Sequence, residues 1–221
     1  MQLHITVGVP LGIGPEIFLL GLSQLSNNLA APPRVYGHRA TLAKTAERLA
    51  LSFPAMDLVE PQQPMDPEKS PGKAQVAYLE EALGSIVEDM NNAVLVTAPI
   101  CKESAHRGGL RFPGHTEYLA HKAGTEQVAM MMAGPRLKVI LATTHIPLTQ
   151  VAPTLAQMDL AGLMQLACRS LRDEFGMECP TLAVAGLNPH AGEAGAFGDE
   201  EARILTRSEE RRVGKECVSE C

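Results

Sequence analysis

Tryptophan is absent from the 221-residue sequence, and phenylalanine and tyrosine together bring the aromatic fraction to only 4%. So few aromatic side chains argue against a stacking surface for single-stranded nucleic acid. No excess of basic residues compensates, because the formal net charge is −6 at pH 7. We therefore expect no nucleic-acid partner.

Long hydrophobic runs are also missing. The longest apolar stretches, such as Ile17 to Leu22, are far shorter than the roughly 20 residues that cross a bilayer. Met1 leads directly into an alternating, strand-like pattern, without the basic segment that opens a signal peptide. The five cysteines include no CxxC pair, which fits a reducing compartment. These features predict a cytoplasmic protein with no membrane partner.

The sequence does contain enough apolar residues for a buried core, at 45% hydrophobic and 20% charged. Strand patterns occupy residues 3–7, 34–37, 93–96, 137–141 and 181–185, and helical spacing of apolar residues occupies 15–25, 40–49, 73–90 and 160–175. Strands that alternate with helices predict an α/β fold with a largely parallel central sheet.

Three histidines lie in unusual polar loops: His115 in PGHTE, His145 in TTHIP and His190 in NPHAGE. His145 and His190 each follow an apolar strand pattern, and α/β sheets gather their chemistry at the carboxyl ends of strands. Neutral imidazoles there suit a divalent transition metal, which needs a third and fourth ligand. The alternative is that each histidine caps a loop by hydrogen bonding. Glu193 is either a further ligand or general base, or a cap of the helix that follows it.

The Gly12-Ile13-Gly14 turn and the lysine of TAPICK are candidates for phosphate or cofactor contacts. Gly12 and Gly14 permit a close approach after the first strand. Ile17 stands where a GxGxxG fingerprint needs its third glycine, so a Rossmann-type dinucleotide site is not indicated. Lys102 offers positive charge to a phosphate or carboxylate, or is a solvated surface lysine. The sequence assigns no catalytic acid, base or nucleophile.

The C-terminal segment 207–221 differs in character from the rest of the chain. It has no apolar periodicity, and its first part, RSEERRVGKEC, resembles a sequencing adapter translated in frame. The alternative is an ordinary solvated terminus. We expect a non-native tail and set it apart from the fold, which also sets apart the CxxxC pair of Cys217 and Cys221.

Five motifs that occur in order give the sequence a family resemblance. GIGPEI, TAPICKE, PGHTEYLA, TTHIPL and GLNPHAGE resemble segments of the 4-hydroxythreonine-4-phosphate dehydrogenase family of vitamin B6 (pyridoxal phosphate) biosynthesis. The resemblance implies an isocitrate/isopropylmalate dehydrogenase-like fold of two α/β lobes, here 1–125 and 126–206, incomplete at the C-terminus. It also implies a cytoplasmic homodimer whose active sites draw on both subunits.

The resemblance assigns roles to four residues. His115 and Thr116 match the family's substrate-binding pair, and His145 and His190 match two of its three metal-ligating histidines. The third histidine falls beyond the part of the family pattern that this sequence contains. Val9 departs from the acidic residue that is usual in the family's first loop.

The implied activity is the oxidation of the secondary hydroxyl of 4-phosphooxy-threonine, followed by decarboxylation to 3-amino-2-oxopropyl phosphate. It uses NAD or NADP and a divalent metal, for which zinc, magnesium, manganese and cobalt all stay open. One alternative is a dehydrogenase of the same fold that acts on a phosphorylated sugar acid or a dihydrodiol carboxylate. Another is a metal-dependent hydrolase that uses His115, His145, His190 and Glu193. We expect the 221 residues alone to be inactive.

Overall fold

The computed structural model describes residues 1–25, 29–87, 92–125 and 127–206. The expected tail, 207–221, lies outside the described residues. The chain divides into two compact units, the first of which is Met1–Ala123 and the second of which begins at Gly124. The lobe limits expected from the sequence, 1–125 and 126–206, stay a prediction.

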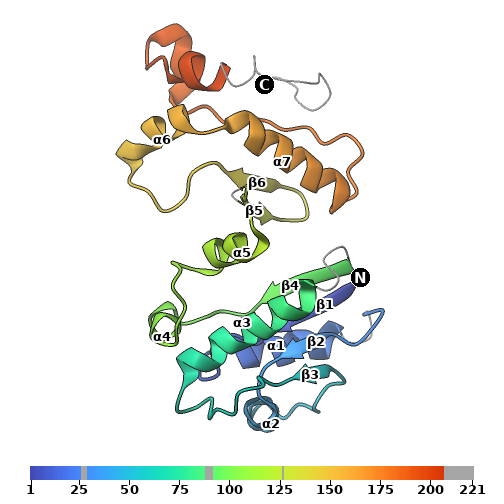
Figure 1. The fold of residues 1–221 in the computed structure, drawn as a ribbon. Helices are drawn as coiled ribbons and strands as arrows, with labels where there is room; N and C mark the ends of the chain where they lie inside the picture. Colours follow the sequence, from blue (N-terminus) through green and yellow to red (C-terminus); the bar gives the residue numbers. More distant parts are fainter. Residues whose placement is uncertain (26–28, 88–91, 126, 207–221) are drawn as a thin grey trace. The chain divides into compact units, whose positions relative to one another are not determined.

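A four-stranded parallel sheet forms the centre of the first unit, in the order β3-β2-β1-β4 (Figure 1). Its strands are β1 (Gln2–Thr6), β2 (Arg34–Tyr36), β3 (Asp57–Val59) and β4 (Ala93–Thr97). Its helices are α1 (Gly14–Leu25), α2 (Arg39–Arg48), α3 (Pro71–Val87), α4 (Lys102–Arg107) and α5 (His115–Ala123). The expected α/β class with a parallel sheet is thus confirmed in this unit.

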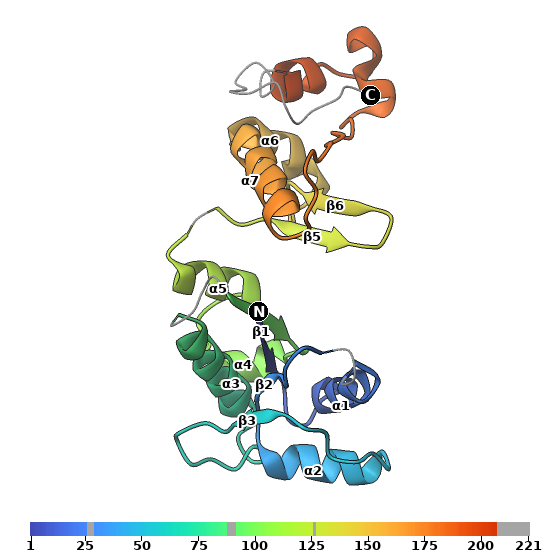
Figure 2. The ribbon, with the colours of Figure 1, turned by 90° about the vertical axis from the view of Figure 1, so that its right-hand side faces the viewer.

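Helices cover both faces of this sheet, as a parallel sheet requires. Figure 2 shows α1 on one side of the strands and α3 on the other. Pro15 and Glu16 stand in the first turn of α1, where a fixed φ and a negative charge both favour a helix start. The core that results is fully buried at Leu19, Val35 and Tyr78.

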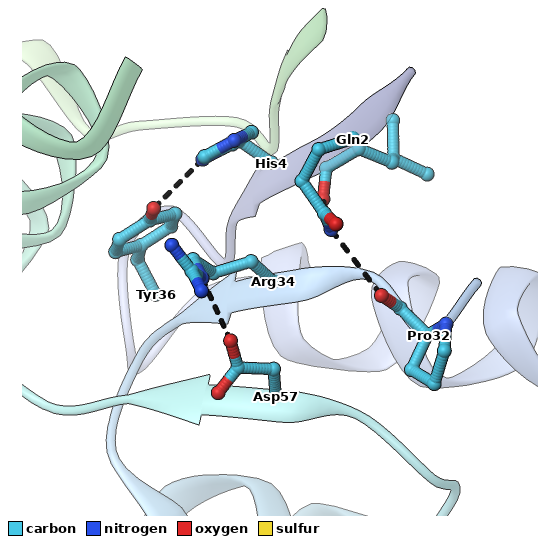
Figure 3. Close-up of polar contacts among 7 residues, drawn as sticks. Gln2, His4, Pro32, Arg34, Tyr36 and Asp57 are labelled. Atoms are coloured by element: carbon cyan, nitrogen blue, oxygen red, sulfur yellow. Dashed lines mark hydrogen bonds and ion pairs between the residues drawn. The ribbon is translucent and has the colours of Figure 1, made fainter. Parts of the chain in front are cut away.

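The first strand buries its polar residues more completely than its apolar ones. His4 and Thr6 are 4% and 2% exposed, whereas Leu3 and Ile5 are only half-buried. The buried imidazole is satisfied because His4 Nδ1 lies 2.8 Å from the Tyr36 hydroxyl of the neighbouring strand (Figure 3). The alternation of apolar residues therefore identifies the strand correctly but does not tell which face is more deeply buried.

Two glycines bring α3 and α4 into backbone contact. A side-chain carbon on Gly72 would overlap the carbonyl of Ser104, and one on Gly108 would overlap the backbone of Gly72. Gly84, near the other end of α3, has nothing within 4 Å of the same position. The start of α3 and the end of α4 approach this closely because Gly72 and Gly108 carry no side chains.

The second unit is built around an antiparallel strand pair and a long helix. The strands are β5 (Met130–Ala133) and β6 (Lys138–Leu141), followed by η3 (Leu148–Gln150), α6 (Val151–Gln157), α7 (Leu160–Asp173), η4 (Pro189–Gly195) and η5 (Glu201–Thr206). Asp159 caps α7 by accepting a 3.0 Å hydrogen bond from the Gly162 N–H. Leu155, Leu160 and Ile204 form the buried cluster of this unit.

The strand expected at residues 181–185 is wrong. This apolar segment has no regular structure, and its Val184 is 47% exposed. A strand exists only by pairing with a neighbour, and in the described part of the second unit β5 and β6 pair with each other. The expectation of a parallel sheet therefore fails in this unit, where the pair is antiparallel.

Among the described helices, none has both the length and the apolar character that a membrane crossing would demand.

We predict that Gly72→Ala lowers the free energy of unfolding of the first unit by about 1–3 kcal/mol, because the added methyl group overpacks the helix crossing. Gly84→Ala is the matched control on the same helix and raises it by up to about 1 kcal/mol. Urea unfolding followed by tyrosine fluorescence measures both, since tryptophan is absent and Tyr36, Tyr78 and Tyr118 all lie in this unit. Equal losses in the two variants would contradict the close crossing.

Candidate functional site

The loops after β1 and β4 meet at one edge of the parallel sheet. The Val9 N–H donates to the Pro99 carbonyl at 3.1 Å, and the Ala98 N–H donates to the Thr6 carbonyl at 3.0 Å. Polar groups at the carboxyl ends of adjacent parallel strands are the usual material of α/β active sites. Candidate residues from the two loops, Gly14 and Lys102, thus belong to one region of the first unit.

The two glycines of the first loop have packing roles in the structure. A side-chain carbon on Gly14 would overlap the Val7 carbonyl and lie 3.3 Å from the Ala98 side chain. A side-chain carbon on Gly12 would overlap the Val9 side chain, and the Gly12 N–H donates to the Val9 carbonyl at 3.0 Å. These contacts explain both glycines without a ligand, and their expected contact with a phosphate or cofactor stays a prediction.

A cavity of about 460 Å³ adjoins the first loop, between it and α2. Its cations are already neutralised: Arg48 pairs with Glu16, and Lys44 pairs with Glu68 at 2.7 Å. The cavity therefore offers an anionic ligand little free positive charge, even though Gly12 lines it.

Lys102 and His115 come together at the starts of two helices. Lys102 is the first residue of α4, and His115 and Thr116 are the first two of α5. A side-chain carbon on Gly114, which precedes α5, would lie 3.9 Å from Lys102 Nζ. We call Lys102, Gly114, His115 and Thr116 the Lys102–His115 cluster.

The charges at this cluster are those of Lys102 and the helix start, with the Glu117 carboxylate nearby. Burial of the half-buried His115 lowers its imidazole pKa, and the positive charge of Lys102 lowers the pKa further. Lys102 takes part in none of the ion pairs between described residues, although Glu117 also lies close to Gly114. The start of α5 adds partial positive charge from its free N–H groups. An ammonium, a hydroxyl and a neutral imidazole at a helix start suit a phosphate or carboxylate.

An apolar cluster holds the three helices of this region together. Val76 and Leu79 of α3, Ala105 of α4 and Tyr118 of α5 are all buried in it. Phe112, in the loop between α4 and α5, stacks at a tilt on Tyr118 with ring centroids 5.4 Å apart. This apolar packing holds the middle of α4 and the first turn of α5 against α3.

The two candidate metal ligands lie in the second unit, on exposed loops with unusual backbone. His145 follows β6 and has φ of 57°, and His190 lies in η4 with φ of 52°. Such positive φ values are rare outside glycine, although histidine tolerates them better than most residues. Because 181–185 is not a strand, the expectation that His190 directly follows one is wrong.

Glu201 anchors the loop that carries His190. Its Oε1 accepts hydrogen bonds from the backbone N–H groups of Leu187 and Asn188, and the Asn188 side chain donates to both Glu200 and Glu201. These hydrogen bonds lower the pKa of the Glu200 and Glu201 carboxyls. Sequence reasoning missed this anchor, which links residues 12 to 14 positions apart.

A complete metal site does not assemble from the described residues. Within them, no group of three or more histidine, cysteine, aspartate or glutamate side chains is arranged to hold a metal ion. His145 and His190 are ligands of the right type, but two imidazoles leave a tetrahedral or larger coordination shell open. The metal-binding role of these two histidines, and of Glu193, stays a prediction.

The first unit is thus an α/β unit with an anion-favouring cluster at the carboxyl end of its sheet, a layout typical of enzymes that handle small anionic substrates. A family model described as "Pyridoxal phosphate biosynthetic protein PdxA" matches residues 23–214. The chain belongs to this family.

Individual relatives agree with this assignment. A 4-hydroxythreonine-4-phosphate dehydrogenase from Desulfosudis oleivorans is 39% identical over 223 residues, which cover 91% of this chain and 66% of the relative. The crystal structure of the enzyme of that name from Klebsiella pneumoniae is 32% identical, with a TM-score of 0.76 over 94% of this chain and 70% of that one. This likeness confirms the expected α/β fold. The chain spans about two thirds of the length of the curated relatives that it matches.

A more distant structure shows how widely the fold is used. The terephthalate 1,2-cis-dihydrodiol dehydrogenase from Burkholderia xenovorans LB400 is 24% identical, with a TM-score of 0.66 over 99% of this chain and 72% of that one. At this identity the likeness concerns the fold alone.

We predict that Lys102→Gln raises the pKa of His115 part of the way to its ordinary value, because it removes the neighbouring charge but not the burial. Lys102→Arg, the matched control, keeps the charge and leaves the pKa low. Because folding lowers the pKa of His115, the neutral imidazole contributes to the free energy of unfolding at pH values above the ordinary pKa of an unfolded histidine. This contribution is lost as the pH falls through the lower pKa of His115 in the folded protein. NMR titration of the His115 ring protons measures the shift, and an unchanged pKa in Lys102→Gln would contradict the contact.

We predict that Glu201→Ala speeds hydrogen exchange at the Leu187 and Asn188 amides at least several-fold, because both N–H groups lose their acceptor. Glu200→Ala is the matched control. It removes only a contact to the Asn188 side chain and leaves the two backbone amides bonded. NMR-detected exchange at single residues makes the comparison, and equal exchange rates in the two variants would show that Glu201 is not the anchor.

Proposed function

We propose that the full-length protein is a 4-hydroxythreonine-4-phosphate dehydrogenase of pyridoxal phosphate biosynthesis. It oxidises the secondary hydroxyl of 4-phosphooxy-threonine, and the 3-keto acid then loses CO2 to give 3-amino-2-oxopropyl phosphate. Family membership supports the reaction. The observation that carries the proposal is the Lys102–His115 cluster, in which a cation that has no ion-pair partner among the described residues stands beside a helix start.

The cluster binds the phosphate end of the substrate in this proposal. Lys102 supplies the charge, and the Thr116 hydroxyl and the N–H groups at the start of α5 donate hydrogen bonds to phosphate oxygens. His115 is neutral at pH 7 because its pKa is lowered, so it donates a hydrogen bond from one ring nitrogen without adding charge. The cluster therefore orients the substrate and does not itself take part in proton or hydride transfer.

The remaining chemistry belongs to groups that this chain does not hold by itself. A divalent metal would polarise the substrate hydroxyl, and NAD or NADP would accept the hydride. His145 and His190 are proposed as two metal ligands, completed from outside the described residues. Since the described set is incomplete, no step is assigned to the metal, whether zinc, magnesium, manganese or cobalt. A homodimer with shared sites and a cytoplasmic location are part of the same proposal.

A dehydrogenase of the same fold acting on another acid is the second candidate. Val9 in the first loop, where the family usually has an acidic residue, favours it, and the fold is also that of a dihydrodiol dehydrogenase. A phosphorylated sugar acid would use the Lys102–His115 cluster in the same way. A dihydrodiol carboxylate would place its carboxylate there instead.

We predict that the purified full-length protein reduces NAD or NADP with 4-phosphooxy-threonine, and that the 221-residue chain alone shows no turnover. Lys102→Ala in the full-length enzyme raises KM about tenfold to a hundredfold, the effect of losing one charge-assisted hydrogen bond. Absorbance of the reduced nicotinamide follows the reaction.

Three outcomes would refute parts of this proposal. Turnover only with a sugar acid or a dihydrodiol carboxylate would establish the second candidate. Hydrolysis without any nicotinamide would establish the metal-dependent hydrolase. Turnover by the 221-residue chain would show that it contains a complete site.

A further inference from the structure

A buried glutamine of α3 holds the turn that leads into α4. Gln75 is only 2% exposed, although glutamine is seldom found so deep in a protein. Its Oε1 accepts from the Cys101 N–H at 3.0 Å, and its Nε2 donates to the Cys101 carbonyl at 3.3 Å and to Ser104 Oγ at 2.8 Å. The oxygen and the NH2 group of the side-chain amide are therefore both hydrogen-bonded to residues 101–104.

These hydrogen bonds lie on both sides of Lys102, which supplies the positive charge of the Lys102–His115 cluster. Lys102 lies between the two residues that Gln75 contacts, Cys101 and Ser104. The Ser104 hydroxyl also donates to the Cys101 carbonyl at 3.2 Å, which closes the turn on itself. The backbone of Lys102 is thus fixed from both sides by one side chain of another helix.

The far end of α4 is fixed independently. The backbones of Gly72 and Gly108 touch, so that α4 rests on the start of α3 at its C-terminal end. Ala105 of α4 and Val76 of α3 are buried together in the apolar cluster and hold the middle of α4. Apolar packing and the glycine crossing, where Gly72 also meets the Ser104 carbonyl, set the axis of α4, and the hydrogen bonds of Gln75 act on the turn that begins at Cys101.

We propose that Gln75 is a positioning residue that holds Lys102 against the start of α5. The need for exact placement comes from the charge: the influence of an ammonium on a neighbouring group falls with distance and with exposure to water. Lys102 is exposed and has a long, flexible side chain, so a mobile backbone would let the charge drift from the anion site. The role of this placement in substrate binding rests on the proposed function, but the placement itself does not.

The test uses His115 as a reporter of where the Lys102 charge lies. Gln75→Leu removes the amide at nearly constant volume, and Gln24→Leu is the matched control on an exposed glutamine of α1. In the 221-residue chain, NMR titration should show that Gln75→Leu raises the pKa of His115 by at least half as much as Lys102→Gln does. The double variant Gln75→Leu/Lys102→Gln should move no further than Lys102→Gln alone, because both changes act on the same charge.

Each outcome of these titrations either supports or overturns the positioning role of Gln75. An unchanged His115 pKa in Gln75→Leu, with a clear change in Lys102→Gln, would make Gln75 a purely structural residue and overturn the proposal. Additive shifts in the double variant would do the same. If Gln75→Leu fails to fold, Ser104→Ala removes one of the three Gln75 contacts, and a smaller shift in the same direction supports the proposal while no shift refutes it.

A kinetic measurement separates this proposal from the proposed function. In the full-length enzyme, Gln75→Leu should raise KM for 4-phosphooxy-threonine about as much as Lys102→Ala and leave kcat within about twofold, since only binding of the phosphate end is weakened. A fall in kcat at constant KM would contradict the positioning role. If the enzyme does not use this substrate, the kinetic arm fails, whereas the NMR result still stands.

Discussion

The parallel pairing of β1 with β4 is the constraint on which the rest of the first unit depends. These strands are more than 80 residues apart in the sequence, yet Gln2 lies opposite Ala93 and Thr6 opposite Thr97. Because parallel strands end at the same edge, the pairing brings the loop after β1 beside the loop after β4. It thereby determines that α1 and α4 begin at the same edge, and with them the region where an anion can bind. Gly14 permits this arrangement, since a larger residue would push α1 away from Val7.

Two histidine–tyrosine pairs show how polar side chains beside the sheet are accommodated in the core. His4 bonds to the Tyr36 hydroxyl, and His38 Nδ1 lies 2.6 Å from the Tyr78 hydroxyl. Burial raises the pKa of both tyrosines and lowers that of His38, so the phenols stay protonated and the imidazole of His38 stays neutral at pH 7. Neutral pairs avoid the desolvation cost of a buried charge.

Sequence reasoning succeeded where the signal is local and failed where it depends on a distant partner. The helices at 15–25, 40–49 and 160–175 are each found within two residues of their predicted bounds, because apolar spacing and caps are local properties. The segment 181–185 has the same apolar character as a buried strand, but strand formation depends on a neighbour that its own residues do not encode. Gln75 is harder to recognise from the sequence, because it is a single polar residue between Ala74 and Val76, both of which are buried.

The candidate site shows the same division. The motifs PGHTE and TAPICK marked Lys102, His115 and Thr116 as separate candidates, but they did not predict that the charge of Lys102 acts on His115. Nor did they show what holds Lys102 in place. The exposed Lys44 forms an ion pair with Glu68 at 2.7 Å. Among described residues Lys102 has no such ion pair, and its charge instead disfavours protonation of His115. The charge of Lys102 therefore lies where a bound anion would be attracted, which is why the cluster is proposed to bind the phosphate end of a substrate.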